Sequence, residues 1–223
     1  MAKAVIFDID GTLLDSVDLH ARAWVEAFRD FGHTVEFQEV RGQIGKGGDQ
    51  LLPVFLSPAE IGSQGEGLEK HRSAIFKERY LPEVMAFPDV RRLFQRLLEH
   101  GMKVALASSA KGDELETYKQ IAGIEDLIDA ETSSDDADKS KPHPDIFEAA
   151  IQRLGAVPRA AIYVVGDTPY DAEAAGKAGL RTIGVTCGGW SEDELKRAGC
   201  IEVYADPADL LDRYDESPLA EPE

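Results

Sequence analysis

A short apolar run near the N-terminus limits what this chain can fold into more than any other stretch. Residues 4–7 (Ala-Val-Ile-Phe) are apolar, and acidic residues and Gly11 follow them directly. Such a run is typical of a strand that is buried in a parallel sheet. We expect this strand to place Asp8 at its C-terminal end, the edge at which open α/β sheets carry out their chemistry.

Asp8 and Asp10 form an acidic pair at that strand end. Two carboxylates so close together oppose each other's ionisation, and a divalent cation removes this cost. Mg²⁺ suits one or two protein carboxylates together with phosphate oxygens, so the pair indicates metal-assisted phosphoryl chemistry. The alternative is that Asp8 caps the next segment and Asp10 lies in an ordinary turn. An EF-hand loop is excluded because its third acid and its later glutamate are missing.

Charge and cysteine content argue against several classes of protein. The 223 residues contain 24 Lys and Arg against 42 Asp and Glu, a net charge of −18, which disfavours nucleic acid and anionic membranes as partners. Cys187 and Cys200 are too few for a disulfide framework, which fits a reducing cytosol. There is neither a leader-like N-terminus nor a run of about 18 apolar residues for a membrane span. We therefore expect a cytoplasmic protein.

The order of helical and strand patterns predicts the architecture. Residues 16–31 and 68–80 have helical spacing of apolar side chains. After Pro88 helices alternate with short apolar strands, which is typical of a parallel sheet with right-handed crossovers. From Asp215 onward the chain is rich in Pro, Glu and Asp, which predicts a disordered tail. These later strands are expected at residues 104–107, 161–165, 181–186 and 201–204.

Polar side chains follow two of the later strands at the same predicted edge. Ser108 and Ser109 end one strand, where hydroxyls and a helix N-terminus bind phosphate oxygens. A serine there would also serve as a plain helix N-cap. Asp167 and Asp171 lie on either side of Pro169, which starts a helix, so the two acids can face one point. We favour a metal-binding pair over acids that only complement the helix dipole.

Cations are expected near this edge from two segments. Lys141 precedes Pro142, which fixes the direction of a segment arriving at the sheet edge, and Lys139 is the nearby alternative. Lys46 lies in the glycine-rich loop 41–49, which is not a P-loop because a glycine follows the lysine and no strand precedes the loop. We interpret Lys46 as a substrate contact rather than a solvated loop residue. His20 shares a helix face with Trp24. We expect Trp24 to be buried, whereas His20 could equally contact the substrate or pack in the interior.

Four motifs of this chain, in order, resemble those of the haloacid dehalogenase superfamily in its phosphatase and phosphomutase branch. They are Asp8-x-Asp10-Gly-Thr, Ser108 after a strand, Lys141-Pro-x-Pro-Asp-x-Phe, and Gly-Asp167-x₃-Asp171. The resemblance covers the chain to about residue 214. It implies a Rossmann-like α/β fold, with a three-layer parallel-sheet core and an inserted all-helical cap. The implied bounds are 1–16 and 88–214 for the core, 17–87 for the cap and 215–223 for a disordered tail.

The resemblance also implies roles for individual residues. Asp8 would be the nucleophile that forms an aspartyl-phosphate, and Asp10 would act as general acid and then base. Ser108 and Lys141 would hold the phosphoryl oxygens. Mg²⁺ would be held by Asp8, the backbone carbonyl of Asp10, Asp167 and Asp171, the last directly or through water. His20, Lys46 and Ser109 are the predicted substrate-binding residues.

The first hypothesis for function is a phosphatase acting on a small phosphorylated metabolite. The Gly166-Asp167 pair resembles phosphoglycolate-phosphatase-like hydrolases, whereas β-phosphoglucomutase-like mutases tend toward Glu-Asp there. A mutase is therefore the alternative, and a catalytically idle binding protein of the same fold is the second alternative. A hydrolytic dehalogenase is disfavoured because that branch needs neither Asp10 nor the metal acids. A monomer and a homodimer are both open.

Overall fold

The computed structural model describes residues 2–220. Its centre is a six-stranded sheet in the order β5-β4-β1-β6-β7-β8, in which all neighbours are parallel. The first strand of the chain, which carries Asp8 at its end, thus lies in the middle of the sheet. The predicted α/β class with a parallel sheet is confirmed. The strands are β1 (Ala4–Phe7), β4 (Lys103–Ala107), β5 (Ala130–Thr132), β6 (Ile162–Gly166), β7 (Arg181–Val185) and β8 (Cys200–Tyr204).

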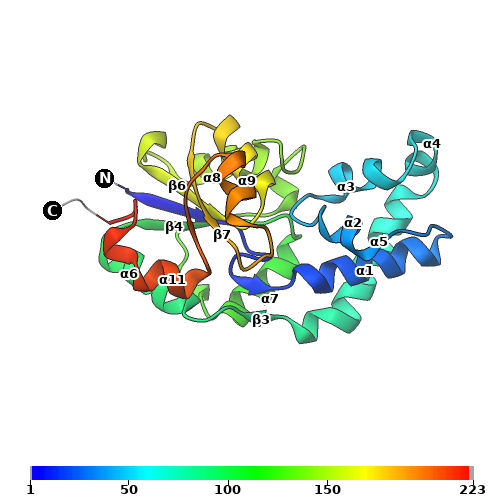
Figure 1. Ribbon diagram of the computed structural model, residues 1–223, viewed down its shortest axis with the longest axis horizontal. Helices are drawn as coiled ribbons and strands as arrows, with labels where there is room; N and C mark the ends of the chain where they lie inside the picture. The colour runs from blue at the N-terminus through cyan, green and yellow to red at the C-terminus, as the bar shows by residue number, and fades with distance from the viewer. Residues whose placement is uncertain (1, 221–223) are drawn as a thin grey trace.

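Helices cover both faces of this sheet. Successive side chains of a strand point to opposite faces, so an apolar strand makes both faces apolar, and both must be buried. Ile6 of β1 belongs to one apolar cluster with Phe147. Phe7 belongs to the other cluster, where its ring centroid lies 4.7 Å from that of Phe94. Figure 1 shows α8 and α9 on one side of the sheet and α6 and α11 on the other. The core helices are α6 (Val90–Glu99), α7 (Gly112–Ala122), α8 (Asp145–Leu154), α9 (Pro169–Lys177), α10 (Glu192–Ala198) and α11 (Pro207–Asp212).

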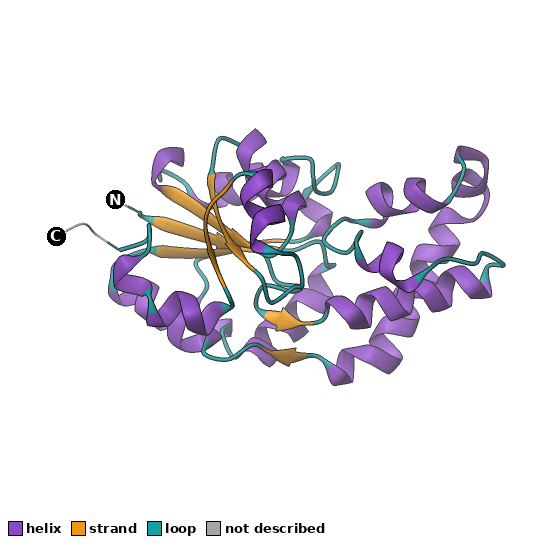
Figure 2. Cartoon of the chain, in the orientation of Figure 1, coloured by secondary structure: helices purple, strands orange, loops and turns teal. Residues whose placement is uncertain are grey.

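A helical segment, residues 17–84, is inserted between two short strands. β2 (Leu14–Asp15) and β3 (Met85–Ala86) pair antiparallel, so the chain leaves the core and returns to it at one place. Figure 2 shows this segment at the end of the molecule opposite both chain termini. The predicted bounds of a separate cap, 17–87, stay a prediction. The helices of the segment are α1 (Val17–Asp30), α2 (Phe37–Arg41), α3 (Gly48–Phe55), α4 (Pro58–Glu60) and α5 (Glu66–Ile75).

The C-terminal residues differ from the sequence prediction. We expected disorder from residue 215, but Leu219 is fully buried in the main apolar cluster. The Ser217 hydroxyl donates to the carbonyl of Tyr214 at 2.6 Å, and its oxygen accepts the N–H of Leu219 at 3.2 Å. The prediction is therefore wrong for residues 215–220, because one leucine gives this acidic stretch something to bury. Residues 221–223 of the predicted tail lie outside the described residues.

None of the helices within residues 2–220 has both the length and the apolar character that a bilayer span requires.

Candidate active site

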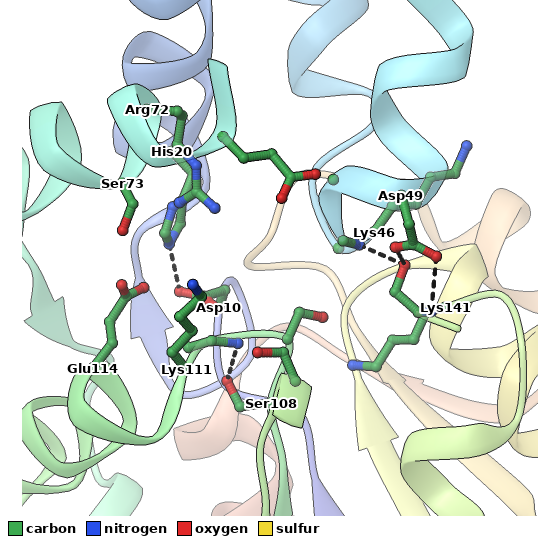
Figure 3. Close-up of a pocket in the computed structure, with 18 of the residues that line it drawn as sticks. Asp10, His20, Lys46, Asp49, Arg72, Ser73, Ser108, Lys111, Glu114 and Lys141 are labelled. Carbon is green, nitrogen blue, oxygen red and sulfur yellow. Dashed lines mark hydrogen bonds and ion pairs between the residues drawn. The ribbon is translucent and has the colours of Figure 1, made fainter. Parts of the chain in front are cut away.

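The predicted site residues meet in a cavity of about 710 Å³ between the sheet edge and the helical segment. Asp8 follows β1, Ser108 follows β4, and Lys141 lies in the loop before α8. Asp8 and Ser108 lie close together because the C-terminal ends of parallel strands share one edge of the sheet. His20 and Lys46 line the cavity from the helical segment. Figure 3 shows His20 above Asp10, Ser108 below Asp10, and Lys141 across from them. Asp10 and Ser109 line the cavity as well, whereas Asp167 and Asp171 lie buried next to Asp8.

Three buried carboxylates form a cluster at the sheet edge. Oxygens of Asp8, Asp167 and Asp171 all lie within 4.8 Å of one another. The Lys141 ammonium contacts the Asp8 carboxylate and lies 2.7 Å from Asp171 Oδ1. Thr12, which the sequence analysis did not single out, donates its hydroxyl to Asp167 Oδ1 at 3.1 Å. One lysine thus faces three acids, which leaves an excess of negative charge in this buried cluster.

The pKa shifts in the cluster follow from this imbalance. Burial raises the pKa of Asp8 to about 7, although Lys141 opposes the shift and Asp171 adds to it. Burial and the neighbouring Asp171 and Asp8 carboxylates raise the pKa of Asp167 well above its usual range. Burial favours a lower pKa for Lys141, but Asp171 and Asp8 outweigh it and the Lys141 pKa is raised. The lysine is therefore a permanent cation, and the acids need a further one.

The residues fit a bound Mg²⁺. Asp167 Oδ2 is buried and has no hydrogen-bond partner within residues 2–220. Two glycines leave room for this carboxylate: a Cβ on Gly188 would lie 1.7 Å from Asp167 Oδ2, and a Cβ on Gly11 would lie 2.4 Å from it. Gly11 also has a φ of +83°, which favours glycine. A buried oxygen without a partner, in a set of hard carboxylate donors, matches the preference of Mg²⁺.

Asp10 has one fixed oxygen and one free oxygen. Its Oδ1 accepts the Ser16 hydroxyl at 2.6 Å and lies 3.0 Å from His20 Nε2. Its Oδ2 has no hydrogen-bond partner among the described residues, and Asp10 lines the cavity. Burial favours a higher pKa for Asp10, but His20 and the Ser16 hydroxyl outweigh it and the Asp10 pKa is lowered. The geometry therefore presents a carboxylate oxygen to whatever fills the cavity.

Ser108 lies fully buried at the cavity wall, and its Oγ accepts the N–H of Ala110 at 3.0 Å. Helix α7 begins only at Gly112, with Lys111 in the N-cap position, so the interpretation of Ser108 as a helix N-cap is wrong. The β4 strand end is followed by a short turn that separates the serine from the helix. The predicted phosphate contact of Ser108 stays a prediction.

The helical segment supplies a different kind of wall. Lys46 donates to Gln43 Oε1 at 2.6 Å, and its Nζ lies 4.4 Å from the centroid of the Tyr170 ring. Arg72 of α5 also lines the cavity. Its guanidinium lies 4.9 Å from the ring centroid of buried Trp24, and its Nε has no hydrogen-bond partner within residues 2–220. No signal in a single sequence separates Arg72 from the surface cations beside it.

The loop that carries Lys46 contacts the core directly. The N–H of Gly47 donates to Ser140 Oγ at 2.9 Å, and the Ser140 hydroxyl donates to Asp49 Oδ1 at 2.5 Å. A Cβ on Gly45 would lie 2.8 Å from Thr168 Cγ2. Ser140 immediately precedes Lys141, so the loop docks next to the lysine of the acidic cluster.

Comparisons with known proteins agree with this geometry. The family model for haloacid dehalogenase-like hydrolases matches residues 5–185. A crystal structure of a hydrolase from Pseudomonas syringae superposes with a TM-score of 0.89 at 32% identity, covering 98% of this chain and all of that one. "Probable phosphatase IndB" of Dickeya dadantii is 30% identical over 97% of this chain and 92% of that protein. A phosphorylated carbohydrates phosphatase of Thermotoga maritima is 30% identical over 81% of this chain and 83% of its own length.

Proposed function

The chain belongs to the haloacid dehalogenase-like hydrolases, and from this premise we propose that it is a Mg²⁺-dependent phosphatase of small phosphate monoesters. The observation that carries the proposal is the arrangement of Asp8 and Asp10 around one cavity. Asp8 lies against Lys141 in the acidic cluster, while Asp10 directs a free oxygen into the cavity. A binding protein has no need for both features. Relatives whose names describe phosphatases of carbohydrate phosphates and of phosphoglycolate support the substrate class.

In the first step, an oxygen of Asp8 attacks phosphorus and the ester P–O bond breaks. The negative charge of the bound phosphate raises the pKa of Asp10, so Asp10 enters this step protonated and gives that proton to the leaving alcohol oxygen, which departs as the alcohol. Ser108 and Lys141 hold the phosphoryl oxygens, and they contribute to catalysis mainly by positioning the group and offsetting its charge. The product of this step is an aspartyl-phosphate on Asp8.

In the second step, Asp10, now a carboxylate, takes a proton from water as the water oxygen attacks phosphorus. The bond between phosphorus and the Asp8 oxygen breaks, inorganic phosphate leaves, and both aspartates return to their initial state. Mg²⁺ held by Asp8, Asp167, Asp171 and the Asp10 carbonyl would neutralise charge on the transferring group. Lys141 remains a cation throughout and keeps the cluster from repelling the anionic substrate.

The test is a hydrolysis screen of small phosphate esters with and without Mg²⁺. It includes phosphoglycolate, hexose phosphates and nucleoside monophosphates, and it measures inorganic phosphate and the released alcohol. We expect equal amounts of both products, and only with Mg²⁺ present. Supplying β-glucose 1-phosphate with its bisphosphate tests the mutase alternative, because glucose 6-phosphate formed faster than free phosphate would overturn the phosphatase proposal.

A further inference from the structure

A chain of hydrogen bonds leads from Asp10 to helix α7 on the other side of His20. His20 Nε2 lies 3.0 Å from Asp10 Oδ1 and also 3.0 Å from the Tyr118 hydroxyl. The Tyr118 hydroxyl donates to Glu114 Oε1 at 2.8 Å. The exposed fractions are 7% for His20, 1% for Tyr118 and 5% for Glu114, so water does not replace these contacts. The chain joins α1 of the helical segment to α7 of the core.

The chemistry of these groups fixes the direction of the chain. A phenol has one proton, and a carboxylate only accepts. Because Tyr118 gives its proton to Glu114, the phenol oxygen faces His20 as an acceptor. His20 Nε2 must then carry a proton, which lies between the Tyr118 oxygen and Asp10 Oδ1. The Glu114 carboxylate, acting through Tyr118, and the Asp10 carboxylate thus favour the same tautomer of His20.

This tautomer matters because His20 orients Asp10. The Nε2–H donates to the Oδ1 atom that also accepts the Ser16 hydroxyl, which leaves Oδ2 for the substrate. The His20 ring is stacked on Phe76 at a centroid distance of 3.9 Å and an angle of 11°, so the ring plane is fixed by packing. A lone pair on Nε2 would instead repel the ionised Asp10.

A simpler role explains only part of this arrangement. Glu114 lies in the first turn of α7, where an acid complements the helix dipole. That role does not require burial, nor a contact with Tyr118. No Lys or Arg forms an ion pair with Glu114 among the described residues, and a buried carboxylate without a cation is costly. Figure 3 shows Glu114 on the side of the cavity next to Asp10.

We propose that Tyr118 and Glu114 are positioning residues for proton transfer at Asp10. They hold His20 in the Nε2–H form, and His20 in turn holds the Asp10 carboxylate with one oxygen toward the leaving group. The inference rests on the proposed phosphatase function, since the two residues would serve the acid and base step at Asp10 in that reaction.

The kinetic test replaces one hydroxyl, in Tyr118→Phe, and compares two substrates. An alkyl phosphate has a poor leaving group that needs a proton, whereas p-nitrophenyl phosphate has a good one that does not. We expect kcat/KM for the alkyl ester to fall about tenfold and that for the aryl ester less than about twofold, with KM unchanged for both. Equal losses for both esters would overturn the inference, because a general loss of structure does not distinguish leaving groups.

A matched control and a double variant sharpen this test. Tyr80 also donates its hydroxyl to a glutamate, Glu26, but in the helical segment away from Asp10. Tyr80→Phe should leave both kcat/KM values unchanged. In a His20→Gln background, Tyr118→Phe should cause no further loss, because both substitutions break the same chain. Additive losses would place Tyr118 outside it.

The tautomer itself is measured by NMR of ¹⁵N-histidine-labelled protein, at a pH above the titration of the histidines. We expect Nε2–H for His20 in the wild type and a larger fraction of the Nδ1–H tautomer in Tyr118→Phe, where only Asp10 still favours Nε2–H. Nδ1–H in the wild type would overturn the inference, whether or not the protein hydrolyses esters. A protein that hydrolyses no ester but keeps the Nε2–H form would overturn the proposed function and still support the Glu114–Tyr118–His20 arrangement.

Discussion

The two sides of the cavity differ in how their charges are arranged. We call the edge of the sheet the floor and the helical segment the roof. At the floor, Asp8, Asp167 and Asp171 are buried, crowded and short of positive charge. At the roof, formed by the helical segment, cations and acids are partly exposed and some of them are paired, as in the contact of Lys70 with Glu66 at 2.6 Å. Exposed pairs of this kind contribute little to stability. The floor therefore has an excess of negative charge that the proposed Mg²⁺ would offset, whereas the side chains of the roof contribute less to the stability of the fold.

The largest expected effect comes from removing the nucleophile at the floor. Asp8→Asn keeps the shape of the side chain but gives a poor nucleophile, so kcat should fall by roughly four to six orders of magnitude. Steady-state phosphate release measures this, and circular dichroism checks that the fold is intact. Normal turnover of Asp8→Asn would show that the covalent mechanism is wrong.

Removing the metal tests the excess of negative charge in the cluster of Asp8, Asp167 and Asp171 directly. With a chelator, turnover should be lost and should return on adding Mg²⁺. Because the pKa values of Asp8 and Asp167 are raised in the folded state, these two groups bind more protons in the metal-free folded protein than in the unfolded chain above pH about 4. Their contribution to the free energy of unfolding should therefore fall, by roughly 2–4 kcal/mol, as the pH rises from about 4 to 7.

Mg²⁺ should reverse this trend, since it binds the ionised carboxylates. Thermal unfolding with and without Mg²⁺ should show a larger stabilisation at pH about 8 than at pH about 5. A Mg²⁺ effect that is the same at both pH values would contradict the assignment of the metal to this cluster.

A smaller effect is expected from filling the space beside Asp167. In Gly188→Ala the new Cβ would overlap Asp167 Oδ2, so the carboxylate must move. We expect the Mg²⁺ concentration for half-maximal activity to rise about 10–100-fold, as for the loss of a supporting contact at a metal site. Gly176→Ala is the control, because its Cβ would meet nothing within 4 Å and its φ, like that of Gly188, is not in the left-handed range. An unchanged Mg²⁺ requirement in Gly188→Ala would exclude Asp167 as a ligand.

The smallest effect is expected at the roof. Lys46→Ala should raise KM about 3–10-fold for a substrate with a second anionic group, and less for one with a neutral tail. The value of kcat should be unchanged, because the contact is the same in the ground and transition states. Competition between the two substrates measures the difference. Equal changes in KM would remove Lys46 from the site.

This contrast also explains what could be predicted from the sequence. Asp8 and Asp167 each follow a buried strand, and Lys141 precedes Pro142. These local patterns fix where the three residues lie, so the sequence alone predicts that they meet at one edge of the sheet. Arg72 and Tyr118 lie within amphipathic helices, where the pattern gives a face but not the neighbour across the cavity. The burial of Leu219 was missed for the same reason, because Leu219 packs into an apolar cluster whose other members are distant in the sequence.

The two glycines that flank Lys46 have a consequence for how such an enzyme diverges. Gly45 lies against Thr168 and Gly47 against Ser140, so neither position has space for a side chain. Lys46, between them, has no such restriction. A substitution at position 46 therefore exchanges the cation, while Gly45 and Gly47 keep their contacts with the core beside Lys141. A change of substrate preference along this route needs no accompanying change in the fold.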